Sequence, residues 1–228
     1  MTAARSRRRV AGRADAVPTG HGGRLAELAV PFGVGLAGTA ALLALGIATD
    51  QRNWPVYLVV LVLGAGAVAA LHHRVRLSPV TVWGLLVFGL GHLAGGMVPV
   101  GAGTLYQLWL VPDVVRYDNL QHALGFGVVG RATWEALAPR LAPAGKDRRA
   151  VAWWVVVLGA NAFGAGNEIV EWVLTLTLES TSVGGYDNTA RDLVANLVGG
   201  VLVGWATARG LAPPDGPRPA GGRPRWLR

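Results

Sequence analysis

The sequence predicts an all-α fold, a polytopic membrane helix bundle of about six transmembrane helices with both termini in the cytoplasm. Hydrophobic residues make up 52% of the 228 residues, charged residues make up only 15%, and the mean hydropathy is +0.39. Soluble domains are less apolar and carry about 25% charged residues. The apolar residues also gather in stretches near the ~20 residues that a helix needs to cross a bilayer. The chain is therefore expected to be a multi-pass protein of the cell (inner, cytoplasmic) membrane.

Six apolar stretches are predicted as helices, at residues 25–48, 55–72, 79–97, 119–138, 150–173 and 189–208. The first follows a basic segment, as a signal peptide would, but its length and the lack of a small-residue cleavage site after Leu45 favour a retained helix. The second and third contain no Asp, Glu, Lys or Arg. The last three are equally long but have acidic residues within or beside them, and these residues are the main functional signal.

The two ends of the chain lack the apolar residues that a folded segment needs. Residues 1–23 are rich in arginine and residues 211–228 are rich in Pro, Gly and Arg. Both are predicted to be disordered cytoplasmic tails, which leaves 24–210 as the transmembrane domain. The net charge of +8 comes mainly from these tails and from short loops. It indicates contact with anionic membrane lipids, and no nucleic-acid partner is expected.

The distribution of basic residues predicts the orientation in the membrane. Lysine and arginine gather in the tails and in the second and fourth connections, whereas the other side has only Arg52, Arg116 and Arg191. The positive-inside rule then places both termini in the cytoplasm. As a consequence, these acidic and histidine residues are expected near the outer leaflet: His92, Asp118, His122, Glu168, Glu171, Asp187 and Asp192.

Helical spacing places the polar residues of each helix on one face. Asp118 and His122 are four residues apart, and Glu168 and Glu171 are three apart. The same faces continue through Asn161, Gly164, Thr175, Asn188, Asn196 and Gly199. A charge in hydrocarbon costs about 3 kcal/mol on insertion scales, so the polar faces of the three helices are expected to meet one another. Arg131 and Glu135, also four residues apart, are expected to form a local pair.

The composition favours a site built from oxygen and imidazole ligands, because the chain has no cysteine. Clustered carboxylates with few basic partners stay protonated or bind a cation. The candidate ligands for one divalent metal ion are Asp118, His122, Glu168, Glu171 and Asp187. The candidate catalytic residues are Glu168, Glu171 and Asp192, and the remaining polar residues expected around them are His92, Asn161, Arg191 and Asn196. This ligand set does not select among Zn, Mn, Fe, Mg and Ca.

Each motif also has a purely structural interpretation. The helix dipole favours a negative charge such as Asp118 at a helix start, and His92 is better explained by packing than by metal binding. Glu168 and Glu171 fit such an interpretation less well. They lie near the C-terminal end of their helix, where the dipole disfavours negative charge, so they need a partner such as Arg191 or His122.

Four sequence motifs lie in order between residues 92 and 196: His92-Leu-Ala-Gly-Gly96, Arg116-Tyr-Asp-Asn-Leu-Gln-His122, Glu168-Ile-Val-Glu171-Trp172 and Arg191-Asp192-Leu-Val-Ala-Asn196. They resemble the YjdF-like family of bacterial inner-membrane proteins, which is itself similar to the VanZ-like proteins named after teicoplanin resistance. The resemblance covers about residues 79–205 and implies a role in the cell envelope or in drug tolerance, without a defined activity. Val183-Gly184-Gly185 replaces the Gln-Gly-Asp stretch expected before Asp187.

Two functional hypotheses follow from these observations. In the first, the protein is a membrane enzyme that acts on a lipid or lipid-linked envelope intermediate at the outer leaflet, with Asp187 and Asp192 positioning the substrate or acting as general base. In the second, the acidic residues bind or translocate a cation, a proton or an amphiphile, and no bond is broken. A third alternative is a structural role that only holds the helices together. The sequence alone does not decide whether the chain is an enzyme, nor does it give an oligomeric state.

Overall fold

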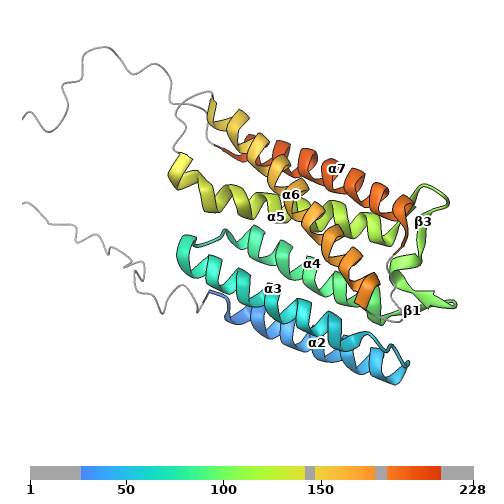
Figure 1. The fold of residues 1–228 in the computed structure, drawn as a ribbon. Coiled ribbons are helices and arrows are strands. Elements are labelled where there is room, and N and C mark those ends of the chain that lie inside the picture. The colour runs from blue at the N-terminus through green and yellow to red at the C-terminus, as the bar shows by residue number, and fades with distance from the viewer. Residues whose placement is uncertain (1–26, 142–146, 178–183, 212–228) are drawn as a thin grey trace, which may run out of the picture.

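The computed structural model describes residues 27–141, 147–177 and 184–211, which are almost entirely helical (Figure 1). Its long helices are α2 (Ala29–Ala48), α3 (Trp54–Val75), α4 (Pro79–Met97), α5 (Tyr117–Leu141), α6 (Asp147–Thr177) and α7 (Tyr186–Gly210). Each corresponds to one of the stretches predicted from the sequence, so the membrane helix bundle is confirmed. The predicted tails lie outside the described residues, apart from Leu211.

Successive helices run in opposite directions, so the bundle has two distinct ends (Figure 1). The start of α2 and the end of α7 lie at one of them. At the other, the α4–α5 connection forms two small hairpins, β1 (Pro99–Val100) with β2 (Gly103–Thr104), and β3 (Trp109–Val111) with β4 (Val115–Arg116). A short 3-10 helix, η1 (Leu105–Gln107), joins them. We call this second end the hairpin end; its strands were not predicted from the sequence.

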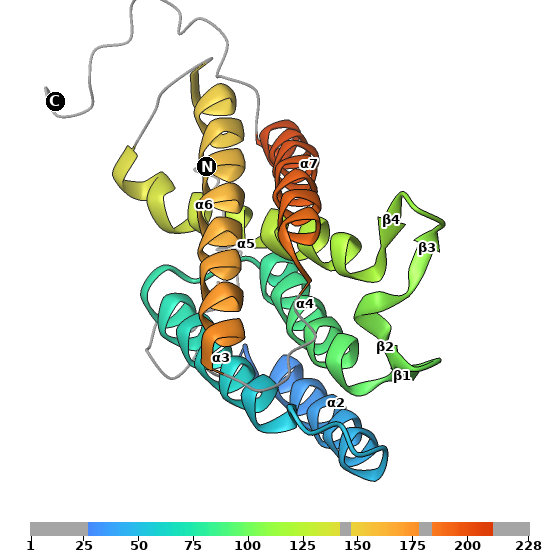
Figure 2. The ribbon, with the colours of Figure 1, turned by 45° about the vertical axis from the view of Figure 1, so that its right-hand side comes forward.

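Five of the described helices are long and apolar enough to cross a membrane, namely α2, α3, α4, α6 and α7. The exception is α5, because Asp118, Arg131, Glu135 and Arg140 interrupt its apolar sequence. It packs against α4, α6 and α7 and so lies among them (Figure 2). The fourth predicted span is therefore a more polar helix, which its neighbours shield from lipid.

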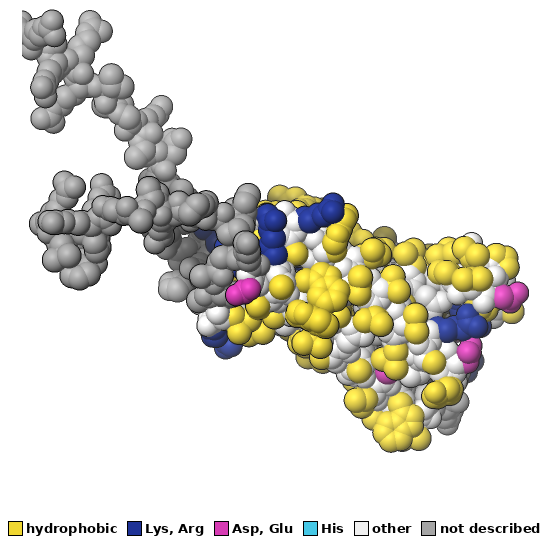
Figure 3. Space-filling model, turned by 90° about the horizontal axis from the view of Figure 1, so that it is seen from above, with side chains coloured by type: hydrophobic (Ala, Val, Ile, Leu, Met, Phe, Trp, Pro, Cys, Tyr) yellow, Lys and Arg dark blue, Asp and Glu magenta, His cyan; other side chains and the backbone are white. Residues whose placement is uncertain are grey.

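Hydrophobic side chains cover the outside of the bundle. On the face seen in Figure 3 they fill the middle, and most of the charged side chains gather towards the two ends. Each apolar helix contributes a large side chain that is more than 60% exposed: Phe32, Leu63, Val87, Leu158 and Leu202. A surface of this kind is stable when it faces lipid hydrocarbon instead of water.

Helices α5, α6 and α7 pack closely because glycines let their backbones approach. A Cβ atom on Gly199 of α7 would lie 1.8 Å from the carbonyl oxygen of Ala123 in α5. Likewise, a Cβ atom on Gly130 of α5 would lie 2.2 Å from the carbonyl oxygen of Val156 in α6. Small residues have this role at many membrane helix interfaces. These contacts fix the distances between the three helices that carry the predicted polar residues.

A partly buried polar network joins α4, α5 and α7 near the end opposite the hairpins. Arg131 and Glu135 form the local pair that the sequence predicted, at 3.2 Å. Glu135 also accepts hydrogen bonds from the Ser78 amide at 2.8 Å, the Ser78 hydroxyl at 2.7 Å and the Thr81 hydroxyl at 2.8 Å. Arg131 in turn reaches the Thr207 hydroxyl at 3.5 Å. Both oxygens of Glu135 are thus satisfied, as a charge inside a bundle requires.

The predicted orientation can be tested by labelling, because a chain without cysteine accepts single cysteines at chosen positions. Arg52 lies at the hairpin end, Arg74 lies at the opposite end, and both are exposed. We expect a membrane-impermeant maleimide added to spheroplasts to label Arg52→Cys and to spare Arg74→Cys, since the basic end should face the cytoplasm. Labelling of Arg74→Cys without Arg52→Cys would show the opposite orientation.

Candidate metal site

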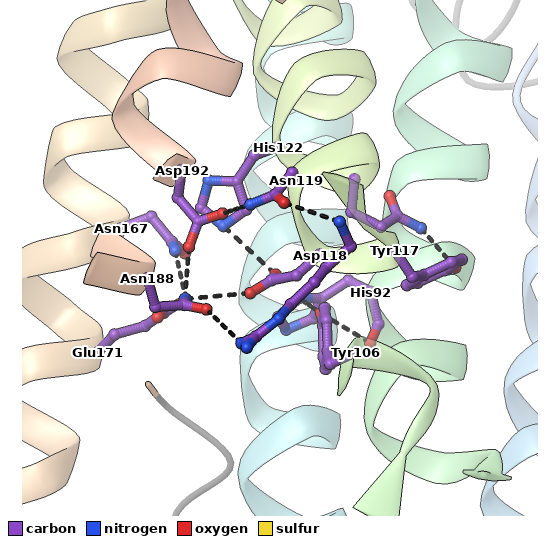
Figure 4. Close-up of polar contacts among 12 residues, drawn as sticks. His92, Tyr106, Tyr117, Asp118, Asn119, His122, Asn167, Glu171, Asn188 and Asp192 are labelled. Atoms are coloured by element: carbon purple, nitrogen blue, oxygen red, sulfur yellow. Dashed lines mark hydrogen bonds and ion pairs between the residues drawn. The ribbon is translucent and has the colours of Figure 1, made fainter. Parts of the chain in front are cut away.

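A cluster of polar side chains lies between α5, α6 and α7 at the hairpin end (Figure 4). Helices α5 and α7 begin at this end and α6 ends there, so the first turns of two helices meet the last turns of the third. The antiparallel arrangement therefore brings together residues that are distant in the sequence. The three polar faces described above all contribute to this cluster.

Asp192 of α7 is fully buried and accepts hydrogen bonds from two amide side chains, Asn119 of α5 and Asn188 of α7 itself. Its Oδ1 accepts a hydrogen bond from Asn119 Nδ2 at 2.8 Å, and its Oδ2 accepts one from Asn188 Nδ2 at 2.6 Å. Asn188 Nδ2 also donates to Asp118 Oδ2 at 3.2 Å. Both asparagines are buried, so amide donors stabilise these two carboxylates in place of solvent.

His122 lies between acidic residues of two helices. Its Nε2 is 3.7 Å from Asp118 Oδ1, and its Nδ1 is 3.6 Å from Glu168 Oε1 and 3.2 Å from Asn196 Oδ1. The side chain is buried. The two carboxylate distances are longer than ordinary hydrogen bonds. A small movement of these side chains would make room for a cation between a ring nitrogen and the carboxylate oxygen that it faces.

Glu168 and Glu171 approach the cluster from α6. Glu171 Oε1 accepts a hydrogen bond from Asn167 Nδ2 at 2.7 Å. Glu168 is only 7% exposed, yet neither of its oxygens accepts a hydrogen bond of ordinary geometry from the described residues, although Asn167 and Thr189 are close by. A buried carboxylate without donors is costly, and proteins normally satisfy such a group with water or an ion.

Two groups of side chains have the proximity that a metal site needs. One consists of Asp118, His122 and Asp192, and the other consists of His122, Glu168 and Glu171. Within each group, one potential ligand atom per residue lies within 4.8 Å of the others. His122 belongs to both groups, so a single imidazole connects all four carboxylates. Oxygen and imidazole ligands of this kind fit a divalent ion such as Zn, Mn, Fe, Mg or Ca.

The described arginines near the cluster form no ion pair with its carboxylates, although the positive charge of Arg116 acts on Asp118 and Asp192. Arg116 donates to Asn188 Oδ1 at 3.4 Å and lies over the Trp109 ring at 4.4 Å. Arg191 pairs with Asp187 at 2.8 Å. Among the described residues, no arginine forms an ion pair with the carboxylates of the two groups, which are Asp118, Glu168, Glu171 and Asp192. This excess of negative charge favours a bound cation.

A family model described as "Predicted membrane protein (DUF2238)" matches residues 31–212. The chain belongs to this family. No curated protein and no solved structure matches the chain. The description of the DUF2238 family agrees with the five apolar helices and with the hydrophobic outer surface. The finer resemblance to YjdF-like and VanZ-like proteins stays a prediction.

Not every residue that the sequence suggested belongs to the cluster of this DUF2238 protein. Asp187 points away from it, since its side chain is 82% exposed and pairs with Arg191 one turn later. Arg191 also donates to the carbonyl oxygen of Asp113 in the hairpins, so it does not act as the partner of the α6 glutamates. Asn161 donates to the carbonyl oxygen of Val157 in its own helix at 2.8 Å. Asp187 is therefore left out of the candidate ligand set.

His92 lies in an aromatic group beside the cluster. The Tyr106 hydroxyl donates to the His92 carbonyl oxygen at 3.0 Å and also contacts His92 Nδ1, and the Tyr57 ring lies 5.2 Å from the His92 ring. Burial raises the pKa of the Tyr106 hydroxyl well above its ordinary value, so it remains a proton donor at neutral pH. These contacts connect η1 to α4 and support a packing role for His92.

Two residues of the cluster in this DUF2238 protein were missed in the sequence. Asn167 directly precedes Glu168 and is four residues from Glu171, so its spacing was a usable signal. Asn119 gave no such signal, because its partner Asp192 lies 73 residues away. The same separation explains why the sequence could suggest that the helices meet but not which atoms pair.

Proposed function

We propose that this DUF2238 protein binds a divalent metal ion at the hairpin end and uses it to process a lipid or lipid-linked envelope intermediate at the outer leaflet of the cytoplasmic membrane. The ligands would be Asp118, His122, Glu168 and Glu171. The observation that carries the proposal is Glu168, a buried carboxylate that lies 3.6 Å from a histidine and accepts no hydrogen bond of ordinary geometry from the described residues. A cation between Glu168 and His122 would satisfy both groups.

The chemistry that suits this arrangement is hydrolysis or group transfer at a phosphate or ester. A divalent ion polarises the oxygen atoms of such groups and makes a bound water more acidic. Glu171, oriented by Asn167, would hold the ion with one carboxylate oxygen, and its other oxygen would then accept a proton as general base. Asp192, held by two asparagines, would orient Asp118 and the substrate. The resemblance to VanZ-like proteins supports an envelope substrate.

Translocation of a cation or proton, the alternative from the sequence, has less support. One turn inward from Asn196, the α7 face continues with Gly199 and Gly200, which pack directly on backbone atoms of α5 and α6. Among the described residues, the next charged groups farther inward are those of the Arg131 network, whose carboxylate is already satisfied. A conducting path normally needs a chain of polar groups or water between the two sides. A binding site that ends at Asn196 agrees better with this packing.

The proposal is tested by elemental analysis of detergent-purified protein. We expect stoichiometric divalent metal in the wild type and at least a tenfold loss in His122→Ala and Glu171→Gln, because each change removes a ligand from a small set. Asp187→Asn serves as the matched control: it removes an outer-end acid that lies outside both groups, and it should keep its metal.

Two results would contradict the metal proposal. One is well-folded wild-type protein without metal even after incubation with Zn, Mn, Fe, Mg or Ca salts. The other is an equal loss in Asp187→Asn, which would assign the metal to the outer surface. Metal bound stoichiometrically without turnover of lipid-linked phosphates in proteoliposomes would retain the binding site and reject the enzymatic part of the proposal.

A further inference from the structure

A cavity of about 520 Å³ lies beside the candidate metal site, between α3, α5 and α6. This volume falls in the range of roughly 300 to 1,000 Å³ that is typical of ligand pockets. Residues of α4 and η1 close it at the hairpin end, where His92 and Tyr106 are part of its wall. The cavity is therefore lined by residues of α3, α4, α5 and α6 and extends well beyond the acidic cluster.

The two parts of this cavity differ in chemistry. At the hairpin end its wall contains Asp118 and Glu171, one residue from each of the two candidate metal groups. Farther from the hairpins the wall is apolar and includes Val60 and Leu63 of α3 and Phe163 of α6. A compartment with a charged end and an apolar body matches an amphiphile better than a fully polar or fully apolar ligand.

The apolar part of the cavity opens sideways, towards the membrane. Leu63 is 69% exposed, Phe163 is 56% exposed and Val170 is 52% exposed, although all three line the cavity. In addition, α3 packs mainly on α4, whereas α6 packs on α5 and α7, so the α3–α6 boundary lacks the close packing of the other interfaces. In a bilayer this opening faces hydrocarbon, which makes lipid the molecule that reaches it directly.

We propose that one hydrocarbon chain of a phosphate-bearing membrane lipid enters between α3 and α6 and occupies the apolar part, while its phosphate lies beside Asp118 and Glu171. The position of the lipid's hydrocarbon chain is inferred from the shape and the apolar wall of the cavity alone. The attraction of the phosphate to an acidic end rests on the proposed function, because only a bound cation would make that end favourable for an anion. The protein would thus take its lipid from the bilayer without exposing the chain to water.

Gly166 offers a variant that fills the cavity without disturbing the fold. It lines the cavity, and a Cβ atom there would have no neighbour within 4 Å, so a leucine side chain would extend into the open space. Gly33→Leu in α2 is the matched control, because its Cβ atom also has no neighbour and it does not line the cavity. Both changes replace a helical glycine by a better helix former.

The test uses phosphatidylglycerol with a diazirine on one acyl chain, incorporated into nanodiscs with the full-length protein. After photolysis, we expect labelled peptides from the cavity-lining parts of α3 and α6, and at least a tenfold loss of this labelling in Gly166→Leu but not in Gly33→Leu. Equal labelling of the wild type and Gly166→Leu, or labelling spread evenly over the lipid-facing surface including α2, would overturn the proposal.

The same experiment separates the lipid cavity from the metal site. Chelator treatment and His122→Ala should leave the hydrocarbon chain in place if the cavity alone holds it, and should release it if the phosphate anchors it through the metal. We expect release, seen as at least a fivefold loss of cavity labelling both on chelator treatment and in His122→Ala. Unchanged labelling would overturn the phosphate placement, whereas metal content measured on the same samples reports independently on the proposed function.

Discussion

Gly199→Ala is expected to separate α7 from α5 and to destabilise the folded protein by about 3 kcal/mol or more. The new Cβ atom would meet the carbonyl oxygen of Ala123 at 1.8 Å, and a backbone oxygen cannot move aside as the end of a flexible side chain can. The two helices would have to move apart, and the hydrogen bonds from Asn119 to Asp192 and from Asn188 to Asp118 join the same pair of helices. The change should therefore weaken packing and the polar cluster together.

The measurement is thermal unfolding in detergent, together with the yield of monodisperse protein. Gly64→Ala in α3 is the control, since its Cβ atom has no neighbour within 4 Å and the gain in helix propensity is worth up to about 1 kcal/mol. We expect a large fall in melting temperature for Gly199→Ala and little change or a small rise for Gly64→Ala. Similar melting temperatures for the two variants would show that α5 and α7 are not packed as described.

Glu168→Gln and Glu135→Gln are expected to change the stability of the metal-free protein in opposite directions. Glu168 is buried and accepts no hydrogen bond of ordinary geometry from the described part of the chain, so removing its charge should raise the free energy of unfolding by about 1 to 3 kcal/mol. Glu135 accepts hydrogen bonds from Ser78, Thr81 and Arg131, so the same substitution should lower it by about 1.5 to 3 kcal/mol. The chemical change is identical, and only the surroundings differ.

Thermal unfolding in detergent with a chelator compares these two variants. Addition of the metal should then stabilise the wild type and Glu135→Gln but not Glu168→Gln, because a bound ion stabilises only a protein that keeps its ligands. Destabilisation of the metal-free protein by Glu168→Gln would mean that this carboxylate has a partner in the folded state. That result would remove the main observation behind the metal site.

The sequence predicted the helices well, because length and apolar composition are local properties. The bounds were least accurate for α6, which continues beyond the apolar stretch on both sides and runs over Asp147–Thr177. The hairpins could not be predicted in the same way, since their strands are only two or three residues long. Such short strands have no periodic pattern, and their pairing depends on the ends of α4 and α5 that they connect.

The candidate site was predictable at the level of helix faces but not of individual partners. The spacing of Asp118 with His122 placed them on one face, and the cost of charge in lipid predicted that this face meets the others. The four-residue spacing of Asp187 and Arg191 was a usable signal for their pairing, whereas no local spacing showed that Asn119 turns inward to Asp192. The direction of a side chain in the first turn of a helix depends on neighbours from other parts of the chain.

The polarity of α5 has a consequence for how the protein is made. A charged residue at the centre of a helix costs about 2.5 to 3.5 kcal/mol on the scale for insertion by the translocon, and α5 contains both Arg131 and Glu135. Among the described helices, its polar partners Thr81, Glu168 and Asp192 lie on α4, α6 and α7, and the last two helices are synthesised after it. Arg131 and Glu135 find partners in Ser78 and Thr81 at the start of α4, which is synthesised first, whereas the polar cluster at the hairpin end is complete only when α6 and α7 have followed.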